Sequence, residues 1–384
     1  VTTVEHAQVI SDEQLGEWRI PSGWRVDEEG VWLITEDKPI RVSPVQIVLT
    51  ARLLCRDDNT EKIRVGFRRD GELKTVDSAR STVFSRAKIV ELADFGLPIS
   101  TETAKNVVRY LHEFEICNFD LLPSKVVTGH FGWFDARNFL PGVNPDGIQF
   151  SPAGPGDAQI AAAYREKGEI AEWVQLAAEC RKHPFVRAAL AGSFAAPLMR
   201  DIGFRPFIVY LYGESEGGKS AALALAMSAW GEPEGLKASF NATKTATEKL
   251  AHLYSDLPLW LDERQVVDRT ERGRQMVDAL MYIITQGRGR GRGSKGGGLQ
   301  TFSTWRTVAL TCGEDPIVET ETATGVRVRA IELFGKPFEG DDALARRVYE
   351  VTAQHHGLAG PEFIKRYLAE KTDILAGYEH ALKY

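Results

Sequence analysis

The clearest chemical pattern in the sequence is the segment 213–220, which reads GESEGGKS. It follows the apolar run 207–211 and precedes an apolar stretch that begins at Ala221. Glycines let consecutive backbone N–H groups turn inward around a phosphate, and the N-terminus of a following helix adds partial positive charge. The spacing therefore predicts a nucleotide-binding loop between a buried strand and a helix. A chance match in a Gly-rich loop is the alternative, and the strand–loop–helix context argues against it.

Each residue type in this loop has an expected role. Lys219 is expected to reach the β and γ oxygens of ATP, and the Ser220 hydroxyl is expected to bind Mg²⁺. Glu214 and Glu216 place negative charge beside a site for a polyanion, so we expect them to point outward and to weaken nucleotide affinity. The predicted nucleotide-binding set is Gly213, Glu214, Ser215, Glu216, Gly217, Gly218, Lys219, Ser220 and Ala221.

Two adjacent carboxylates, Asp262 and Glu263, follow the apolar run 257–261. Ligands of open α/β sheets bind at the carboxyl ends of the strands, and adjacent strand residues face opposite ways. We therefore expect Asp262 to hold Mg²⁺ and Glu263 to polarise the attacking water. Two solvated acids at an exposed strand end are the alternative. The pair favours hydrolysis by water over transfer to a small-molecule acceptor.

Two further strands carry weaker candidates. Thr311 ends the predicted strand 306–311, where it is as consistent with contacting the γ-phosphate as with being an ordinary strand terminus. The strand 325–333 places Arg327 and Arg329 on one face. An arginine without a local carboxylate can reach the γ-phosphate bound by a neighbouring subunit. An ordinary surface strand is an equally good interpretation.

The segment 286–298 alternates glycine with arginine, and no acidic residue occurs between Asp278 and Glu314. Such a sequence neither packs a core nor holds a helix, so it predicts a mobile cationic loop. We expect it to bind DNA phosphates; a flexible solvated linker is the alternative. The net charge of −6 excludes a protein that coats nucleic acid with its whole surface, but it permits a local patch. The predicted DNA-binding residues are Arg288, Arg290, Arg292 and Lys295.

The composition indicates a globular protein of two to three domains, with 384 residues, 43% hydrophobic and 26% charged. No apolar run is long enough to span a bilayer, and no secretory signal is visible, so we expect no membrane association. The four cysteines are widely separated and form no C-x-x-C pair. This argues against a zinc site and favours the reducing cytoplasm.

The elements that must position these residues fall into four predicted regions. Residues 31–84 alternate apolar and polar positions, so we expect 1–150 to form a mostly β N-terminal domain, a possible collar that grips DNA. The Ser-, Pro- and Gly-rich segment at 151 begins a helical linker, 151–203. An α/β P-loop NTPase core is predicted over 204–335 and a helical segment over 336–384.

Several segments together resemble one helicase-like family of phages, plasmids and mobile elements, long catalogued as a domain of unknown function. That family includes the Cch helicases of cassette-type mobile elements, which are MCM-like AAA+ proteins. The matching segments are GESEGGKS (213–220), NATKTATE (241–248), LWLDE (259–263), GRGRGR (287–292), TWRT (304–307), TCGE (311–314) and Gly132-Trp133.

The resemblance implies a replicative-type helicase: an AAA+ core in a hexameric ring that moves on single-stranded or forked DNA and hydrolyses ATP between subunits. It implies that 287–298 is a hairpin pointing into the channel. It favours Arg329 over Arg327 as the arginine finger, and a primase or initiator as a further partner. An ATP-switched initiator or loader ring stays open, as does a small-molecule kinase built on the same loop.

Overall fold

The computed structural model describes residues 18–240, 242–262, 271–291, 293, 297–298, 302–316 and 328–383. The chain divides into two compact units, 1–128 and 129–384. We expected the first boundary at 151, but residues 129–150 belong to the second unit because Phe131, Trp133 and Phe139 pack in its core. The composition break at 151 instead marks the turn before α3, whose first residue is Pro155.

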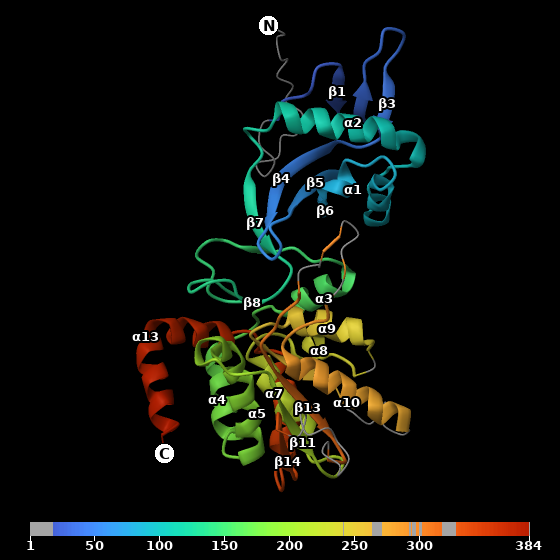
Figure 1. The fold of residues 1–384 in the computed structure, drawn as a ribbon. Coiled ribbons are helices and arrows are strands. Elements are labelled where there is room, and N and C mark those ends of the chain that lie inside the picture. Colours follow the sequence, from blue (N-terminus) through green and yellow to red (C-terminus); the bar gives the residue numbers. More distant parts are fainter. Residues whose placement is uncertain are drawn as a thin grey trace. The chain divides into compact units, whose positions relative to one another are not determined.

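The first unit is built mainly of short and medium strands, with one long helix (Figure 1). Its elements are β1 (Trp24–Asp27), β2 (Gly30–Leu33), β3 (Ile40–Ser43), β4 (Ile47–Cys55), β5 (Glu61–Arg69), β6 (Glu72–Ala79), α1 (Arg80–Val83), the 3₁₀ helix η1 (Ile89–Phe95), α2 (Thr101–Cys117) and β7 (Ser124–Thr128).

Alternating apolar residues explain the antiparallel pairing of β4, β5 and β6. The β5–β6 turn places Asp70 and Gly71 at φ +55° and +82°, the left-handed pair that a two-residue hairpin favours. Helix α2 begins with a capping box at Ser100, and its apolar face is buried through Val107 and Phe114.

The second unit begins with three short strands and a group of helices, continues through a parallel sheet and ends in helices. Its elements are β8 (Gly132–Trp133), β9 (Phe139–Leu140), β10 (Gln149–Phe150), α3 (Pro155–Ala163), α4 (Ile170–Cys180), α5 (Pro184–Ala195), η2 (Ala196–Leu198), α6 (Met199–Ile202), β11 (Phe207–Tyr212), α7 (Lys219–Ser228), α8 (Pro233–Leu236), α9 (Lys244–Leu253), β12 (Leu257–Leu261), α10 (Glu271–Gln286), β13 (Thr307–Gly313), β14 (Ala330–Phe334), α12 (Asp342–Thr352) and α13 (Ala359–Ala381).

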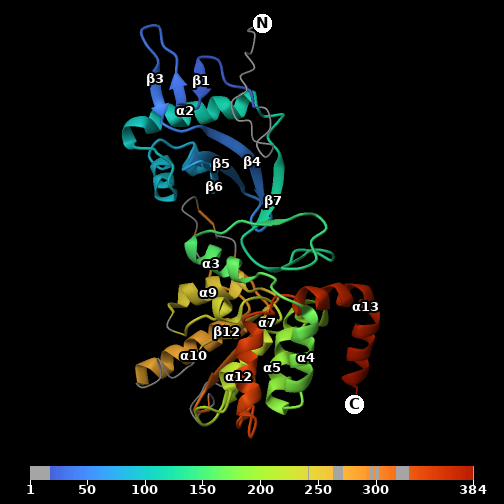
Figure 2. The same ribbon diagram turned by 180° about the vertical axis from the view of Figure 1, so that it is seen from behind.

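The sheet has the order β12-β13-β11-β14, and all three neighbouring pairs are parallel. Parallel strands need crossover connections, which place helices on the faces of the sheet. Figure 1 shows α4 and α5 on one side of the sheet and α10 on the other, and Figure 2 shows the same arrangement from behind. The carboxyl ends of β11, β12 and β13 therefore share one edge of the sheet, and their amino ends share the opposite edge.

Helix α7 is the buried centre of this unit. Every residue from Ala221 to Ser228 is buried, so its Ala- and Leu-rich sequence packs on all sides. Two polar contacts fix it against α5: the Ser193 hydroxyl donates to the Ala226 carbonyl at 2.7 Å, and the Trp230 indole N–H donates to Ser193 at 2.9 Å. None of the helices that the structure describes is sufficiently long and apolar to cross a membrane.

Two glycines of α13 provide a matched test of this packing. A Cβ at Gly360 would lie 2.3 Å from Cε3 of Trp230, whereas a Cβ at Gly377 meets no atom within 4 Å. We expect Gly360→Ala to destabilise the protein by about 1–3 kcal/mol, because the buried ring cannot move away. Gly377→Ala should stabilise it by about 0.5–1 kcal/mol through helix propensity. Urea unfolding measures both, and equal midpoints for the two variants would contradict this packing.

Candidate functional site

The loop 213–218 leaves the carboxyl end of β11 and turns directly into α7. Its backbone is left-handed at three positions, with φ +142° at Gly213, +63° at Glu216 and +77° at Gly218. A Cβ at Gly218 would lie 2.6 Å from the Phe338 ring. Gly218 is therefore required by the backbone conformation and by the close approach of Phe338.

The Lys219 side chain is the unusual electrostatic feature of this loop. It is 7% exposed, and its Nζ donates to the carbonyls of Gly213 at 2.8 Å and Glu214 at 2.6 Å. No carboxylate among the described residues lies within ion-pair distance of this ammonium group. A buried cation satisfied only by carbonyl dipoles is costly, so the loop favours an anionic ligand.

A cavity of about 480 Å³ opens beside the loop. Its lining contains seven of the nine predicted nucleotide-binding residues, together with Cys312 and four residues of α12 that the sequence did not indicate. The lining residues are Ser215, Glu216, Gly217, Gly218, Lys219, Ser220, Ala221, Cys312, Asp342, Ala345, Arg346 and Tyr349.

The two acidic residues of the loop behave differently. Glu214 points outward, as expected: its side chain is 78% exposed and pairs with Lys336 at 2.7 Å, and this hydrogen bond lowers the pKa of Glu214. Glu216 lies along the cavity instead, next to the left-handed turn that its own φ creates. The Ser215 hydroxyl donates to the carboxylate of Glu314, which holds the loop against the end of β13.

Asp262 follows the last residue of β12, at the same sheet edge as the loop. Its carboxylate lies 3.5 Å from Lys237, and its backbone N–H donates to the Ala238 carbonyl at 2.7 Å. Burial raises the pKa of Tyr349, and the negative charges of Glu234 and Asp262 raise it further. Asp262 is thus within electrostatic reach of a side chain that lines the cavity.

The strand β13 places Thr311 and Cys312 in different environments. Cys312 lines the cavity, with Sγ 4.0 Å from the Ser220 hydroxyl. Thr311 is fully buried, and its hydroxyl has no hydrogen-bond partner among the described residues. The structure does not bring Thr311 together with the cavity-lining set, and its role stays a prediction. Glu263, Arg292, Lys295 and Arg327 lie outside the described residues.

Arg329 lies at the opposite edge of the sheet from the loop. Its carbonyl accepts a hydrogen bond from Ile208, near the start of β11, and its guanidinium donates to the Thr285 carbonyl at 3.4 Å. At about 3.3 Å per strand residue, Ile208 is roughly 17 Å from Gly213. Arg329 is therefore too distant to contact a ligand in its own loop.

The first part of the Gly–Arg segment forms an antiparallel ribbon with residues 302–305. Arg288 pairs with Thr304, and Gly289 donates to Ser303 at 2.8 Å. The guanidinium of Arg288 lies 4.2 Å from the centre of the Phe302 ring. Arg290 pairs at 3.3 Å with Glu248, a side chain that is 8% exposed. We expected a mobile loop here, but cross-strand pairing and these two contacts order its beginning.

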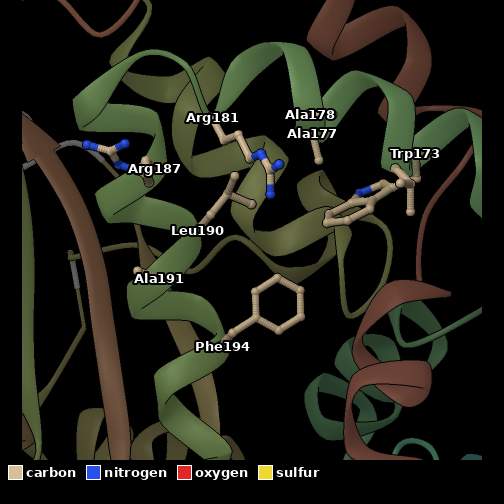
Figure 3. Close-up of a pocket in the computed structure, with 9 residues that line it drawn as sticks. Trp173, Ala177, Ala178, Arg181, Arg187, Leu190, Ala191 and Phe194 are labelled. Atoms are coloured by element: carbon tan, nitrogen blue, oxygen red, sulfur yellow. The ribbon is translucent and has the colours of Figure 1, made fainter. Parts of the chain in front are cut away.

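A second cavity, of about 430 Å³, lies between α4 and α5. Figure 3 shows Trp173, Leu190 and Phe194 facing it, with Arg181 at its rim. Its lining contains two arginines, Arg181 and Arg187, and is otherwise apolar. It offers none of the glycine-rich backbone and hydroxyl groups that the loop 213–220 brings to its cavity, so the cavity beside Lys219 is the stronger candidate for an anionic ligand.

The described residues of the second unit thus form a parallel α/β core. The glycine-rich loop 213–218 lies at one edge of its sheet, and the Gly–Arg ribbon lies at the opposite edge. The sequence profile of the domain of unknown function DUF927 matches residues 24–304, which is more than half of the 384 residues. The chain belongs to this family, as its motifs indicated. No curated protein matches the chain.

A solved structure described as "SCCmec type IV Cch - active helicase" has the same fold, with a TM-score of 0.66 and 21% identity. The match covers 92% of this chain and 66% of that one, so this chain spans about two thirds of the helicase. Two structures of the NrS-1 C-terminal region are 11% and 10% identical, with TM-scores of only 0.30 and 0.31. Each of these two matches covers 82% of this chain; they cover 66% and 65% of the respective NrS-1 chains.

The ion pair between Arg306 and Asp256 at the base of the ribbon can be tested as an anchor of the ribbon. Asp256 is 1% exposed, pairs with Arg306 at 2.7 Å and accepts from the Trp133 N–H at 3.2 Å. We expect Arg306→Ala to lower the free energy of unfolding by about 2–3 kcal/mol, because it leaves a buried carboxylate without its cation. Arg165→Ala removes an exposed pair with Glu232 and should cost less than about 1 kcal/mol. Similar losses in both variants, measured by urea unfolding, would contradict this anchoring role.

Proposed function

We propose that this protein is an ATP-driven DNA helicase or translocase of the replicative type, with an AAA+ core that assembles into a hexameric ring. The observation that carries the proposal is the buried Lys219 ammonium, which lacks a carboxylate partner among the described residues. The fold shared with a structure described as an active helicase supports the proposal of ATP-driven unwinding of DNA. The family resemblance favours a phage or mobile element as the source, and a primase or initiator as a partner.

The residues around the cavity suit ATP hydrolysis. Lys219 is positioned to leave its carbonyl partners for the β and γ oxygens, and the loop N–H groups are suited to line the phosphates. Ser220 and Asp262 are the residues that would hold Mg²⁺, which neutralises phosphate charge when it is bound. Arg346 lines the same cavity from α12 and adds a cation that the motif did not predict.

In the chemical step, water attacks the γ-phosphorus and the bond to the β–γ bridging oxygen breaks. Glu263 accepts the proton of the water, so ATP and water give ADP, phosphate and one proton. Thr311 remains a candidate to position that water. The products carry more negative charge than ATP, and this favours their release from a loop that also carries Glu214 and Glu216.

The position of Arg329 supports an ATP site that is formed by two neighbouring subunits. Because Arg329 lies at the amino edge of its own sheet, we assign it to the γ-phosphate of a neighbouring subunit. Val328 and Ile331, on either side of it, are 77% and 51% exposed, which suits an edge that a second subunit covers. The ring would then place the basic ribbon of each subunit along DNA, with Arg288, Arg290, Arg292 and Lys295 as the proposed phosphate contacts.

Glu263→Gln tests the assignment of the general base. The amide is nearly isosteric but accepts no proton, so turnover should fall by at least about 100-fold while ATP binding is retained. Turnover is measured as phosphate release, and binding by equilibrium titration with labelled ATP. Asp373→Asn, on an exposed part of α13, is the matched control and should leave both unchanged. Normal hydrolysis by Glu263→Gln would reassign the base.

Mixing two inactive variants tests the shared site. Lys219→Ala lacks the loop cation and Arg329→Ala lacks the finger, so each alone should hydrolyse ATP poorly. In randomly mixed rings, about one quarter of the sites combine an intact loop with an intact finger, and activity should return. An equimolar mixture that stays inactive, despite mixed oligomers in native mass spectrometry, would contradict action in trans.

Strand displacement separates the helicase from an ATP-switched initiator or loader ring. Purified protein with ATP and a forked duplex should release the displaced strand. Hydrolysis stimulated by DNA without displacement would favour the initiator or loader.

A further inference from the structure

We propose that Phe302 is a stacking site for a nucleobase of single-stranded DNA, and that Arg288 covers its ring until the base arrives. This inference rests on the proposed DNA-binding function and extends it. The Gly–Arg sequence indicates only contacts with phosphates, whereas an aromatic ring on the same ribbon adds a surface for bases.

The geometry of the ribbon brings the side chains of Arg288 and Phe302 together. Arg288 is the cross-strand partner of Thr304, so Phe302 is its diagonal neighbour on the same face. The guanidinium carbon lies 4.2 Å from the centre of the ring. A Cβ at Gly291 would lie 3.2 Å from the ring edge, so the glycine lets the backbone pass close beside Phe302.

Phe302 is not the residue that anchors the ribbon. Beside the Arg306–Asp256 pair, Trp305 anchors the ribbon: it is 2% exposed and donates its indole N–H to the Ile284 carbonyl at 2.8 Å. Phe302 is only partly buried, and Arg288 and Thr304 beside it are exposed. An aromatic ring held at the surface of a basic ribbon suits a flat partner, because every base has a π face.

The ribbon arginines differ in their partners. Arg290 is committed to Glu248 of its own subunit, where it compensates a nearly buried carboxylate. Arg288 has no carboxylate within ion-pair distance among the described residues, and only the ring holds it. When a base replaces the guanidinium on Phe302, Arg288 is free to turn to the adjoining phosphate. The exchange leaves neither the ring nor the cation without a partner.

This division of roles predicts two separable effects on DNA affinity. Stacking on Phe302 depends on bases and releases no counterions, so its loss should leave the salt dependence unchanged. Loss of the Arg288 charge should reduce the slope of log affinity against log salt by about 0.7 for single-stranded DNA.

The experiment compares an oligodeoxythymidylate with an abasic deoxyribose-phosphate strand of equal length, using fluorescence anisotropy with the full chain. Phe302→Ala should weaken binding of the thymidylate by about 5- to 150-fold and leave binding of the abasic strand almost unchanged. Phe302→Trp should retain affinity, because the larger ring still stacks. Tyr282→Ala removes an aromatic side chain that is 45% exposed on α10 and should change neither affinity.

The outcomes separate this inference from the proposed function. If the unaltered protein binds neither strand, the DNA-binding function itself fails. If it binds both but Phe302→Ala weakens both equally, or reduces the salt slope, the ring has no role in base stacking and the inference is wrong. A fall confined to the base-containing strand, with unchanged ATP hydrolysis in the absence of DNA, supports it.

Discussion

The parallel pairing of β11 with both β13 and β14 determines where the loop 213–218, Cys312 and Arg329 lie. Hydrogen bonds on both sides fix the register of β11, with Phe207 beside Val308 and Ile208 beside Ala330. Because all the strands run the same way, the loop, Asp262 and Cys312 emerge at one edge, and Arg329 and the ribbon lie at the other. The length of the strands therefore separates the candidate anion site from the basic ribbon.

The buried ammonium of Lys219 adds a second constraint. Two loop carbonyls satisfy it, and the loop reaches this conformation only because Gly218 permits a left-handed backbone beside Phe338. Phosphate oxygens carry more charge than carbonyls and bind an ammonium more strongly. A polyanion therefore competes well for Lys219, and the exposed pair of Glu214 with Lys336 keeps one acidic side chain of the loop away from it.

The parts of the site that the sequence predicted are those encoded by contiguous residues. The loop, the strand before Asp262 and the apolar pattern of α7 are local, so periodicity and glycine spacing were sufficient. Arg346 and Tyr349 line the same cavity but come from a distant amphipathic helix, and no local pattern distinguishes them from surface residues. The boundary between units was misplaced for a related reason: Trp133 joins the second core through tertiary packing, which composition does not show.

The strand β13 joins the two edges physically. It begins just after Trp305 and Arg306 at the base of the ribbon and ends beyond Cys312 at the cavity, a span of about 23 Å. All seven of its residues are buried, and neighbours are hydrogen-bonded on both sides, so it cannot slide alone without breaking two ladders. Coupling between the cavity and the ribbon along β13 would therefore move the sheet as one body, because a shift of β13 alone breaks backbone hydrogen bonds to both neighbouring strands.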